Sequence, residues 1–234
     1  MARRLAGEGG LRGPRVHLQE TESTNAVARE LALRGAVSGT LVTAAAQTAG
    51  RGRQGRAWVA PPGAALLCSW VIRHPRALLS LAAGVAVAEV AGAEAVLKWP
   101  NDVLLDGRKV AGILVEGRPQ EGWAVLGIGL NVAVRLEQLP EELRDRAGTL
   151  GLSRAEIEPT LARLTGRLER WLAASDPEVI AAVRAIDALR GEAVRWDGGR
   201  GRATGIDDTG RLQVASVAGS EVALDAGEVH LERG

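Results

Sequence analysis

The segment at residues 50–56, GRGRQGR, combines backbone freedom with positive charge, and Trp58 follows it. Glycines let the backbone approach a ligand closely, and the arginines between them can reach an anion. The segment is not the phosphate loop GxxxxGK[ST], because no Lys-Ser or Lys-Thr pair follows it. It also lacks the context of the dinucleotide fingerprint GxGxxG, because no helix is expected before Pro61. On its own, it fits an anion site and a solvated basic loop or RNA-binding tract equally well.

Three later segments carry further polar groups that could act on an anion. Residues 98–102, KWPND, place an ammonium, an amide and a carboxylate at the turn after a strand. Lys109 stands at the mouth of the apolar run 110–116, in which Gly112 leaves room for a flat ligand. Residues 127–131, GIGLN, contain two glycines, which in a strand mark close approach by backbone or ligand, and end on an amide. Each segment alone also fits a purely structural role: a turn with polar residues at 98–102, a hairpin cap at Lys109 and a β-bulge at 127–131.

Residue usage gives these segments more weight. Only two of the 29 basic residues are lysines, Lys98 and Lys109, and the only asparagines are Asn25, Asn101 and Asn131. Phe and Tyr are absent, which indicates a general codon bias against these residue types. A lysine that persists against this bias suggests a position that needs a compact ammonium rather than a planar guanidinium.

Length and composition exclude several classes of protein. A chain of 234 residues with 46% hydrophobic residues can bury a core and is not disordered as a whole. A formal net charge of +1 argues against a global field that attracts nucleic acid or membranes. The single cysteine, Cys68, excludes a disulfide framework and a cysteine-based zinc site. No stretch has the pattern of a secretory signal or a spanning helix, so we expect a cytoplasmic protein.

Hydrophobic periodicity predicts an α+β domain followed by a small β domain. Helices are expected at 26–34, 76–90, 153–173 and 177–189, and strands at 40–46, 64–72, 95–99, 110–116 and 123–130. After Gly191 the chain changes to short alternating runs broken by Asp-Gly turns, which is typical of a small antiparallel barrel. We expect a flexible lead at residues 1–14, a main domain at 15–187 and a C-terminal domain at 188–234.

Together, these segments resemble the sequence pattern of biotin–protein ligases. That pattern contains STN, a glutamine before GRGRxGRxW, then KWPND, KxAGIL-E and GxGxN. The chain has all of them in this order, at 23–25, 47, 50–58, 98–102, 109–116 and 127–131. The match is specific as a whole, although each piece alone is weak. It implies a mixed sheet with flanking helices, of the class II synthetase-like type seen in the catalytic domain of that family, followed by an SH3-like barrel.

The resemblance implies an ATP-dependent ligase that works in two steps. Biotin and ATP form biotinyl-5′-adenylate, which then acylates one lysine of a biotin carboxyl carrier protein domain. Biotin, ATP and Mg²⁺ are the expected substrates and cofactor, and a homodimer is a further expectation. Only residues 1–22 precede Ser23, too few for a helix-turn-helix module. A short form without DNA binding or repressor activity is therefore expected.

Roles for individual residues also follow from the resemblance. The implied catalytic residues are Arg53, Lys109 and Lys98, which act on the biotin carboxylate and the phosphates. The implied biotin-binding residues are Ser23, Thr24, Asn25, Gln47, Arg51, Gly52, Arg53, Lys109, Gly112, Gly127 and Gly129. The implied ATP-binding residues are Arg53, Trp58, Lys98, Asn101, Lys109 and Asn131. Asn101 and Asp102 are the implied Mg²⁺ contacts, and the three strand glycines are expected to line an apolar slot for the thiophane ring.

Two alternatives stay open on the sequence. A lipoate or octanoate ligase would share the general fold, although segments 50–58 and 98–102 favour biotin. A non-enzymatic RNA-binding module would use the basic loop, but the low net charge and the lack of aromatic neighbours other than Trp58 count against it. Ala60 departs from the family pattern, in which a serine is common. Little effect is expected, because Pro61 and Gly63 keep the turn.

Overall fold

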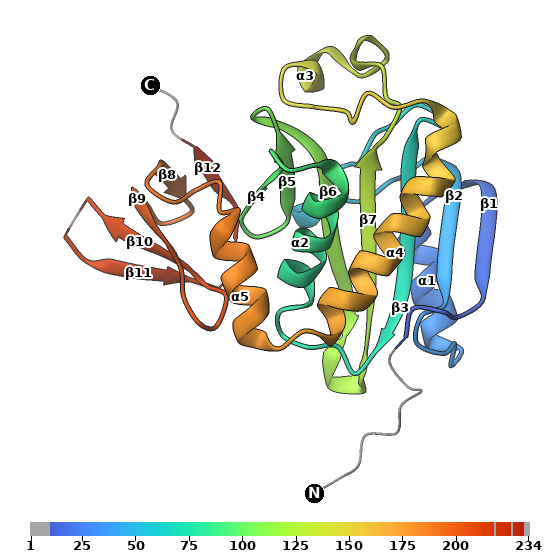
Figure 1. Ribbon diagram of the computed structural model, residues 1–234, viewed down its shortest axis with the longest axis horizontal. Helices are drawn as coiled ribbons and strands as arrows, with labels where there is room; N and C mark the ends of the chain where they lie inside the picture. Colours follow the sequence, from blue (N-terminus) through green and yellow to red (C-terminus); the bar gives the residue numbers. More distant parts are fainter. Residues whose placement is uncertain (1–9, 218, 226, 232–234) are drawn as a thin grey trace, which may run out of the picture.

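The computed structural model describes residues 10–217, 219–225 and 227–231, which form a large mixed sheet, a small sheet and the helices around them (Figure 1). The large sheet has the strand order β1-β2-β3-β7-β6-β5-β4. Strands β1 and β2 are parallel, and all other neighbours are antiparallel. The strands are β1 (Arg15–Thr21), β2 (Leu41–Gln47), β3 (Ala65–Arg73), β4 (Val96–Lys98), β5 (Asp102–Leu105), β6 (Arg108–Arg118) and β7 (Trp123–Asn131). The mixed sheet with flanking helices confirms the expected α+β class.

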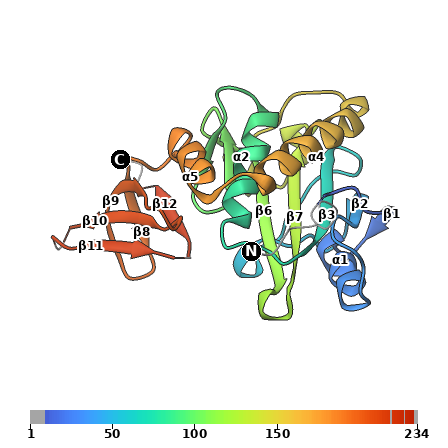
Figure 2. The same ribbon diagram turned by 60° about the horizontal axis from the view of Figure 1, so that its bottom comes forward.

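Helices cover both faces of the large sheet (Figure 2). On one face, α1 (Thr24–Leu33) contacts β2, β3 and β7. On the other face, α2 (Leu79–Ala91) contacts β5 and β6, and α4 (Ile157–Ala173) packs on α2 and β3. The remaining helical segments are α3 (Glu141–Arg144), α5 (Asp176–Ala185), η1 (Arg53–Gly55), η2 (Pro119–Glu121), η3 (Leu136–Gln138) and η4 (Arg154–Glu156). None of the helices in the described part of the chain is long and apolar enough to cross a membrane.

Side-chain alternation along the central strands separates two cores. Because successive residues of a strand point to opposite faces, Trp70 and Ile128 pack towards α2 and α4. Val71 and Val125 point the other way and pack with Ala28 of α1. The face that carries α1 is only partly covered by this helix, and that uncovered part matters for the site described below.

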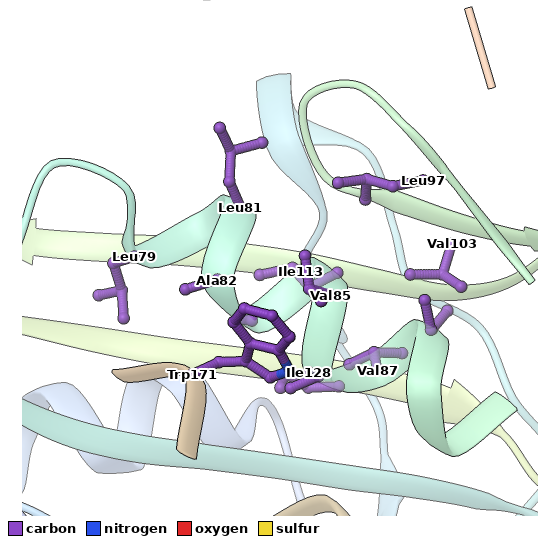
Figure 3. Packing of buried hydrophobic residues seen from close by; sticks show 14 of the residues in the cluster. Leu79, Leu81, Ala82, Val85, Val87, Leu97, Val103, Ile113, Ile128 and Trp171 are labelled. Atoms are coloured by element: carbon purple, nitrogen blue, oxygen red, sulfur yellow. The ribbon is translucent and has the colours of Figure 1, made fainter. Parts of the chain in front are cut away.

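The larger core surrounds α2, which is apolar on nearly every side. A helix of this kind is expected where all of its faces are packed, and α2 lies between the sheet, α4 and α5. Figure 3 shows Val85 of α2 beside Ile113 of the sheet, with Trp171 of α4 in the same cluster. Gly84 of α2 allows this approach, because a Cβ at that position would lie 2.7 Å from Cδ1 of Leu97.

The C-terminal residues form a five-stranded antiparallel sheet, which confirms the expected small β domain. Its order is β11-β10-β9-β8-β12. The strands are β8 (Ala193–Trp196), β9 (Gly199–Ile206), β10 (Leu212–Ser216), β11 (Glu221–Leu224) and β12 (Val229–Leu231). The β9–β10 turn contacts the main domain, where Trp99 Nε1 donates to the Gly210 carbonyl at 2.9 Å. We propose the domain boundary between residues 187 and 188, because α5 ends at Ala185 and β8 begins at Ala193.

The main differences from the sequence-based expectation concern β1, β5 and α5. Strand β1 was not expected, because it lies at a sheet edge and exposes polar residues such as His17 and Glu20. Strand β5 was not expected either, because it has only four residues directly after the turn at 99–101. The helix expected at 177–189 ends at Ala185, because the chain then pairs with β4: Leu97 donates to the Ile186 carbonyl and accepts from Ala188. Of the lead expected at 1–14, residues 1–9 lie outside the described residues.

Candidate active site

A cavity of about 700 Å³ lies over the part of the large sheet that α1 leaves uncovered. This volume falls within the range of about 300–1,000 Å³ typical of ligand pockets. Gly127 and Gly129 point to the same face as Val125, which packs on α1, and they form part of the floor. Beside them, Leu67 lies opposite Gly129 in the β3–β7 register and packs with Leu139, and both leucines line the cavity. The cavity therefore follows β7 for about 13 Å, from Gly127 to Asn131.

The structure brings every implied site residue to this one cavity. They come from the start of α1 with its N-cap, the end of β2, the Gly-Arg loop at 50–58, the turn at 98–102, β6 and β7, which are far apart in sequence. The cavity-lining residues among them are Ser23, Thr24, Asn25, Gln47, Arg51, Gly52, Arg53, Trp58, Lys98, Asn101, Asp102, Lys109, Gly112, Gly127, Gly129 and Asn131. Their individual roles stay predictions.

Protein side chains approach the strand glycines closely. A Cβ at Gly127 would lie 2.0 Å from Oδ1 of Asn25, and a Cβ at Gly129 would lie 2.4 Å from Cε2 of Trp58. A Cβ at Gly112 would meet Trp58 at 3.1 Å and the Lys109 side chain at 3.2 Å. All three glycines line the cavity, as expected, with Asn25 directly above Gly127 and Trp58 directly above Gly129; that they form the slot for the thiophane ring stays a prediction.

A buried polar cluster forms the end of the cavity nearest α1. Ser23, Thr24 and Asn25 are all nearly inaccessible to solvent. Oε1 of Gln47 accepts from the Thr24 backbone N–H at 2.7 Å and lies 3.0 Å from the Thr24 hydroxyl. The fully buried Ser69 of β3 donates to Oδ1 of Asn25 at 2.6 Å and lies 2.8 Å from Oγ1 of Thr24. Such a set of amides and hydroxyls suits a small polar ring with both donors and acceptors.

Ser69 was not found from the sequence. It lies within an apolar strand, and its only signal is a hydroxyl among hydrophobic neighbours. The β3–β7 register places it opposite Gly127, directly beneath Asn25.

Positive groups from three segments meet at the centre of the cavity. Lys109 lies at the start of β6, after the β5–β6 turn, and its Nζ lies 2.6 Å from Oδ1 of Asp102. Lys98 is the backbone neighbour of Asp102 in the β4–β5 register, and the Asp102 charge acts on its ammonium. From the Gly-Arg loop, Nη1 of Arg53 donates to Oδ1 of Asn101 at 3.1 Å. The charge of one carboxylate, Asp102, thus acts on three cations while contacting only Lys109, and the centre carries excess positive charge.

The pKa values at this centre reflect burial first and the neighbouring charges second. Burial lowers the pKa of Lys98 below its usual range; Asp102 opposes this effect, and Lys109 adds to it. Burial also lowers the pKa of Arg53, again opposed by Asp102. A guanidinium stays charged in spite of such a shift, whereas an ammonium can lose its proton. Both groups would regain charge stabilisation from a bound anion.

Two buried polar atoms at the far end lack a hydrogen-bond partner within the described residues: Nε1 of Trp58 and Oδ1 of Asn131. Asn131 is held in place because its Nδ2 donates to the Gly148 carbonyl at 2.8 Å. A buried polar group without a partner costs about 1–3 kcal/mol, so a ligand that pairs with these atoms gains affinity. The indole of Trp58 also lies 5.8 Å from Lys109 Nζ, within cation–π range.

Sequence reasoning missed two walls of the cavity. The segment after β7 contributes Leu139, Leu143 and Arg146, and nothing in its composition marks it as part of a site. The C-terminal domain contributes residues 227–231, and Glu228 forms an ion pair with Arg56 of the Gly-Arg loop. The C-terminal domain therefore takes part in enclosing the cavity.

The residues present suit a metal that arrives with a phosphate ligand rather than a metal centre made by protein alone. Within the described ranges, no group of three His, Cys, Asp or Glu side chains could hold a metal ion. The amide oxygen of Asn101 already accepts from Arg53. Asp102 is the carboxylate nearest the cations, and Mg²⁺ typically uses one or two carboxylates together with substrate phosphates.

Comparison with known proteins agrees with this geometry. The Biotin/lipoate A/B protein ligase family matches residues 17–132, and the Biotin protein ligase C terminal domain matches residues 190–231. The chain is 40% identical over 236 residues to a biotin–[acetyl-CoA-carboxylase] ligase of Mycobacterium tuberculosis, covering 90% of this chain and 86% of the relative. A ligase of the same name from Paracoccus denitrificans is 34% identical over 240 residues, covering 91% and 98%.

A solved structure shares the fold of this chain. The biotin protein ligase from Aquifex aeolicus in complex with biotin and ATP superposes with a TM-score of 0.76 at 29% identity. The match covers 94% of this chain and 99% of that structure, so both sheets are included.

Proposed function

This chain belongs to the biotin/lipoate A/B protein ligase family, and from that premise we propose that it is an ATP-dependent biotin–protein ligase that acts on acetyl-CoA carboxylase. The biotin carboxylate attacks the α-phosphate of ATP, which gives biotinyl-5′-adenylate and pyrophosphate. The amine of one carrier lysine then attacks the acyl carbon and releases AMP. The observation that carries the proposal is the convergence of Arg53, Lys98 and Lys109 between a polar pocket and an amide-lined pocket.

Electrostatics explains why the reaction needs this centre. Two anions must approach to bonding distance, and at about 3.5 Å their repulsion is on the order of 5 kcal/mol at an effective dielectric of about 20. Fixed cations offset this repulsion and stabilise the charge that develops on the phosphate oxygens. We assign that task to Arg53 and Lys109, with Lys98 towards the outer phosphates.

The two ends of the cavity suit the two substrates. The cluster of Thr24, Asn25 and Gln47 would bind the ureido ring, because the ring offers two N–H donors and one carbonyl acceptor. At the other end, Asn131 and Trp58 would bind adenine through an amide and an indole face. The glycines of β6 and β7 bring both side-chain sets close to the sheet, so the substrates can meet near Lys109.

Mg²⁺, the carrier and the assembly complete the proposal. We assign Asp102 as the carboxylate that would contact Mg²⁺, which would neutralise charge on the triphosphate when bound. Asn101 keeps a positioning role, because Arg53 already uses its oxygen. The protein partner would be a biotin carboxyl carrier protein domain, in the cytoplasm, where ATP and the carboxylase meet. A homodimer stays a prediction.

The Gly-Arg loop would shield the adenylate from water. It is closed on itself, since Trp58 donates to the Gly50 carbonyl and Gly52 donates to the Arg56 carbonyl. A mixed anhydride survives only where water is excluded, so we expect this loop to move for substrate entry and to close over the intermediate.

The direct test is biotin-dependent exchange of labelled pyrophosphate into ATP. We expect exchange with biotin, followed by transfer to an apo-carrier domain. Exchange with lipoate and none with biotin would refute the assignment and favour a lipoate ligase.

A further inference from the structure

Glu116 lies at the end of the apolar motif of β6, and none of the roles above uses it. Its Oε2 accepts from Nδ2 of Asn25 at 2.8 Å, and its Oε1 lies 4.0 Å from Nη1 of Arg51. The carboxylate therefore bridges the start of α1 and the Gly-Arg loop. Glu116 stands behind the cavity wall and does not line the cavity itself.

The charge of Glu116 determines which atoms of the polar cluster can donate. A carboxylate only accepts, so Asn25 must turn its Nδ2 to Glu116 and its Oδ1 to Ser69. The single hydroxyl proton of Ser69 is then donated to Oδ1 of Asn25, at 2.6 Å. The single proton of Thr24 then points either to the Ser69 oxygen at 2.8 Å or to Oε1 of Gln47 at 3.0 Å, and with either choice a lone pair of Thr24 Oγ1 stays available to a ligand N–H.

The position of Asn25 is as tightly defined as its orientation. Its Oδ1 occupies the space directly above Gly127, where a Cβ would lie at 2.0 Å. With Gly127 below, Ser69 on one side and Glu116 on the other, rotation of the amide would place its NH₂ against the Ser69 hydroxyl and its oxygen against the carboxylate.

We propose that Glu116 is a positioning residue for ring recognition, which sets the donor–acceptor pattern of Asn25, Ser69 and Thr24 and holds Arg51 at the same pocket. This inference rests on the proposed function, which places the ureido ring of biotin at this end. Glu116 acts through its neighbours, so its loss raises the KM for biotin while the rate at saturating biotin changes little.

A glutamine of the same shape cannot replace Glu116, because Glu116 faces two donors. If the glutamine turned its oxygen to Asn25, its NH₂ would face the guanidinium of Arg51. If it turned its oxygen to Arg51, its NH₂ would face Asn25 and force the Asn25 amide to rotate. Asn25 would then donate to Ser69 instead of accepting from it. Even the first choice replaces a charged acceptor for Asn25 by a neutral one and gives up the 4.0 Å pair with the partly exposed Arg51, so we expect the KM for biotin to rise on the order of 10-fold.

The experiment measures biotin-dependent pyrophosphate exchange for the wild type, Glu116→Gln and a matched control, Glu94→Gln. Glu94 is an exposed glutamate outside the cavity. We expect the raised KM in Glu116→Gln alone, with kcat within a fewfold and an unchanged melting temperature. An unchanged KM for biotin would overturn the inference, and so would a loss of kcat with an unchanged KM.

A charge exchange separates orientation from simple packing. In Asn25→Asp/Glu116→Gln, the new carboxylate accepts from both Ser69 and the new glutamine, and the oxygen of that glutamine faces Arg51. We expect this double variant to bind biotin better than Asn25→Asp alone, in which two carboxylates face each other. If the KM for biotin of the double variant is equal to or higher than that of Asn25→Asp, Glu116 does not act by setting the donor–acceptor pattern of Asn25, Ser69 and Thr24.

A second readout does not depend on catalysis. Without the carboxylate to hold Arg51, trypsin should cleave within 51–56 faster in Glu116→Gln than in the wild type, with biotin bound in both. Equal cleavage would refute the link to the loop. Absence of exchange in the wild type itself would instead refute the proposed function, so the two failures are distinguishable.

Discussion

Gly129→Ala places one methyl group where the indole of Trp58 now lies. The added Cβ would lie 2.4 Å from Cε2, 2.7 Å from Nε1 and 2.8 Å from Cζ2 of Trp58. Ordinary contact begins near 3.4 Å, so the indole must move by about 1 Å. Gly129 does not have a positive φ, so the backbone itself is not strained by alanine.

The expected cost falls on activity more than on stability. Overpacking in a closed core costs about 1–3 kcal/mol, but Trp58 belongs to a loop and can shift outwards. The same shift moves the indole away from Lys109 and from its place over the nucleotide end of the cavity. Misplacement of a binding group by 1 Å can cost about 100-fold in rate, which corresponds to about 2.7 kcal/mol.

Pyrophosphate exchange at varied ATP concentration tests this reasoning. We expect kcat/KM for ATP to fall about 100-fold in Gly129→Ala, with little change in melting temperature. Gly166→Ala is the matched control: it lies within α4, a Cβ there would meet nothing within 4 Å, and it should stabilise the protein by about 0.5–1 kcal/mol. In a Trp58→Ala background, Gly129→Ala should cause little further loss. Additive losses would refute the steric argument.

Three further predictions concern charged groups. Lys109→Ala should lower adenylate formation by about 100- to 1,000-fold, because it removes a fixed cation from the reacting centre; single-turnover rates near wild type would exclude that role. Lys98→Arg should move the alkaline limb of kcat/KM for ATP to higher pH, because burial depresses the pKa of Lys98 and arginine stays charged; coincident profiles would argue against titration of Lys98. Glu228→Gln should make trypsin cleavage of the loop fast at all salt concentrations, whereas in wild type cleavage should rise with salt, because the pair with Arg56 is partly exposed and screened.

The main elements were predictable where the hydrophobic pattern of a segment by itself indicates its secondary structure. Strands such as β3 and β7 are continuous apolar runs buried on both faces, and such runs are recognisable without the structure. Strand β1 was missed because an edge strand needs no apolar alternation on its exposed side. The end of α5 was missed because it depends on pairing with Leu97, far away in sequence.

The site was predictable only as a set of motifs. Unusual spacing of glycine, arginine and lysine marked the residues that line the cavity. Supporting residues such as Ser69 and Glu228 had no such signal, since each is one ordinary residue in an ordinary strand or turn. Asn25 and Glu116 lie 91 positions apart, and only the folded sheet brings them together. The three strand glycines are a similar case. The sequence predicts that something approaches the strand closely at these positions, but it does not predict that Asn25 and Trp58 are the side chains that do so.

Asp102 sets the charge of the centre, and its removal should act in the opposite direction to Lys98→Arg. Asp102 raises the pKa of Lys98 against the effects of burial and of Lys109. In Asp102→Asn the shape is kept but this support is lost, so the pKa of Lys98 should fall further. A lysine with a depressed pKa is charged only below that pKa, so the alkaline limb of kcat/KM for ATP should move to lower pH. Opposite shifts in the two variants would identify Lys98 as the titrating group, whereas an upward or absent shift in Asp102→Asn would mean that another group controls the limb.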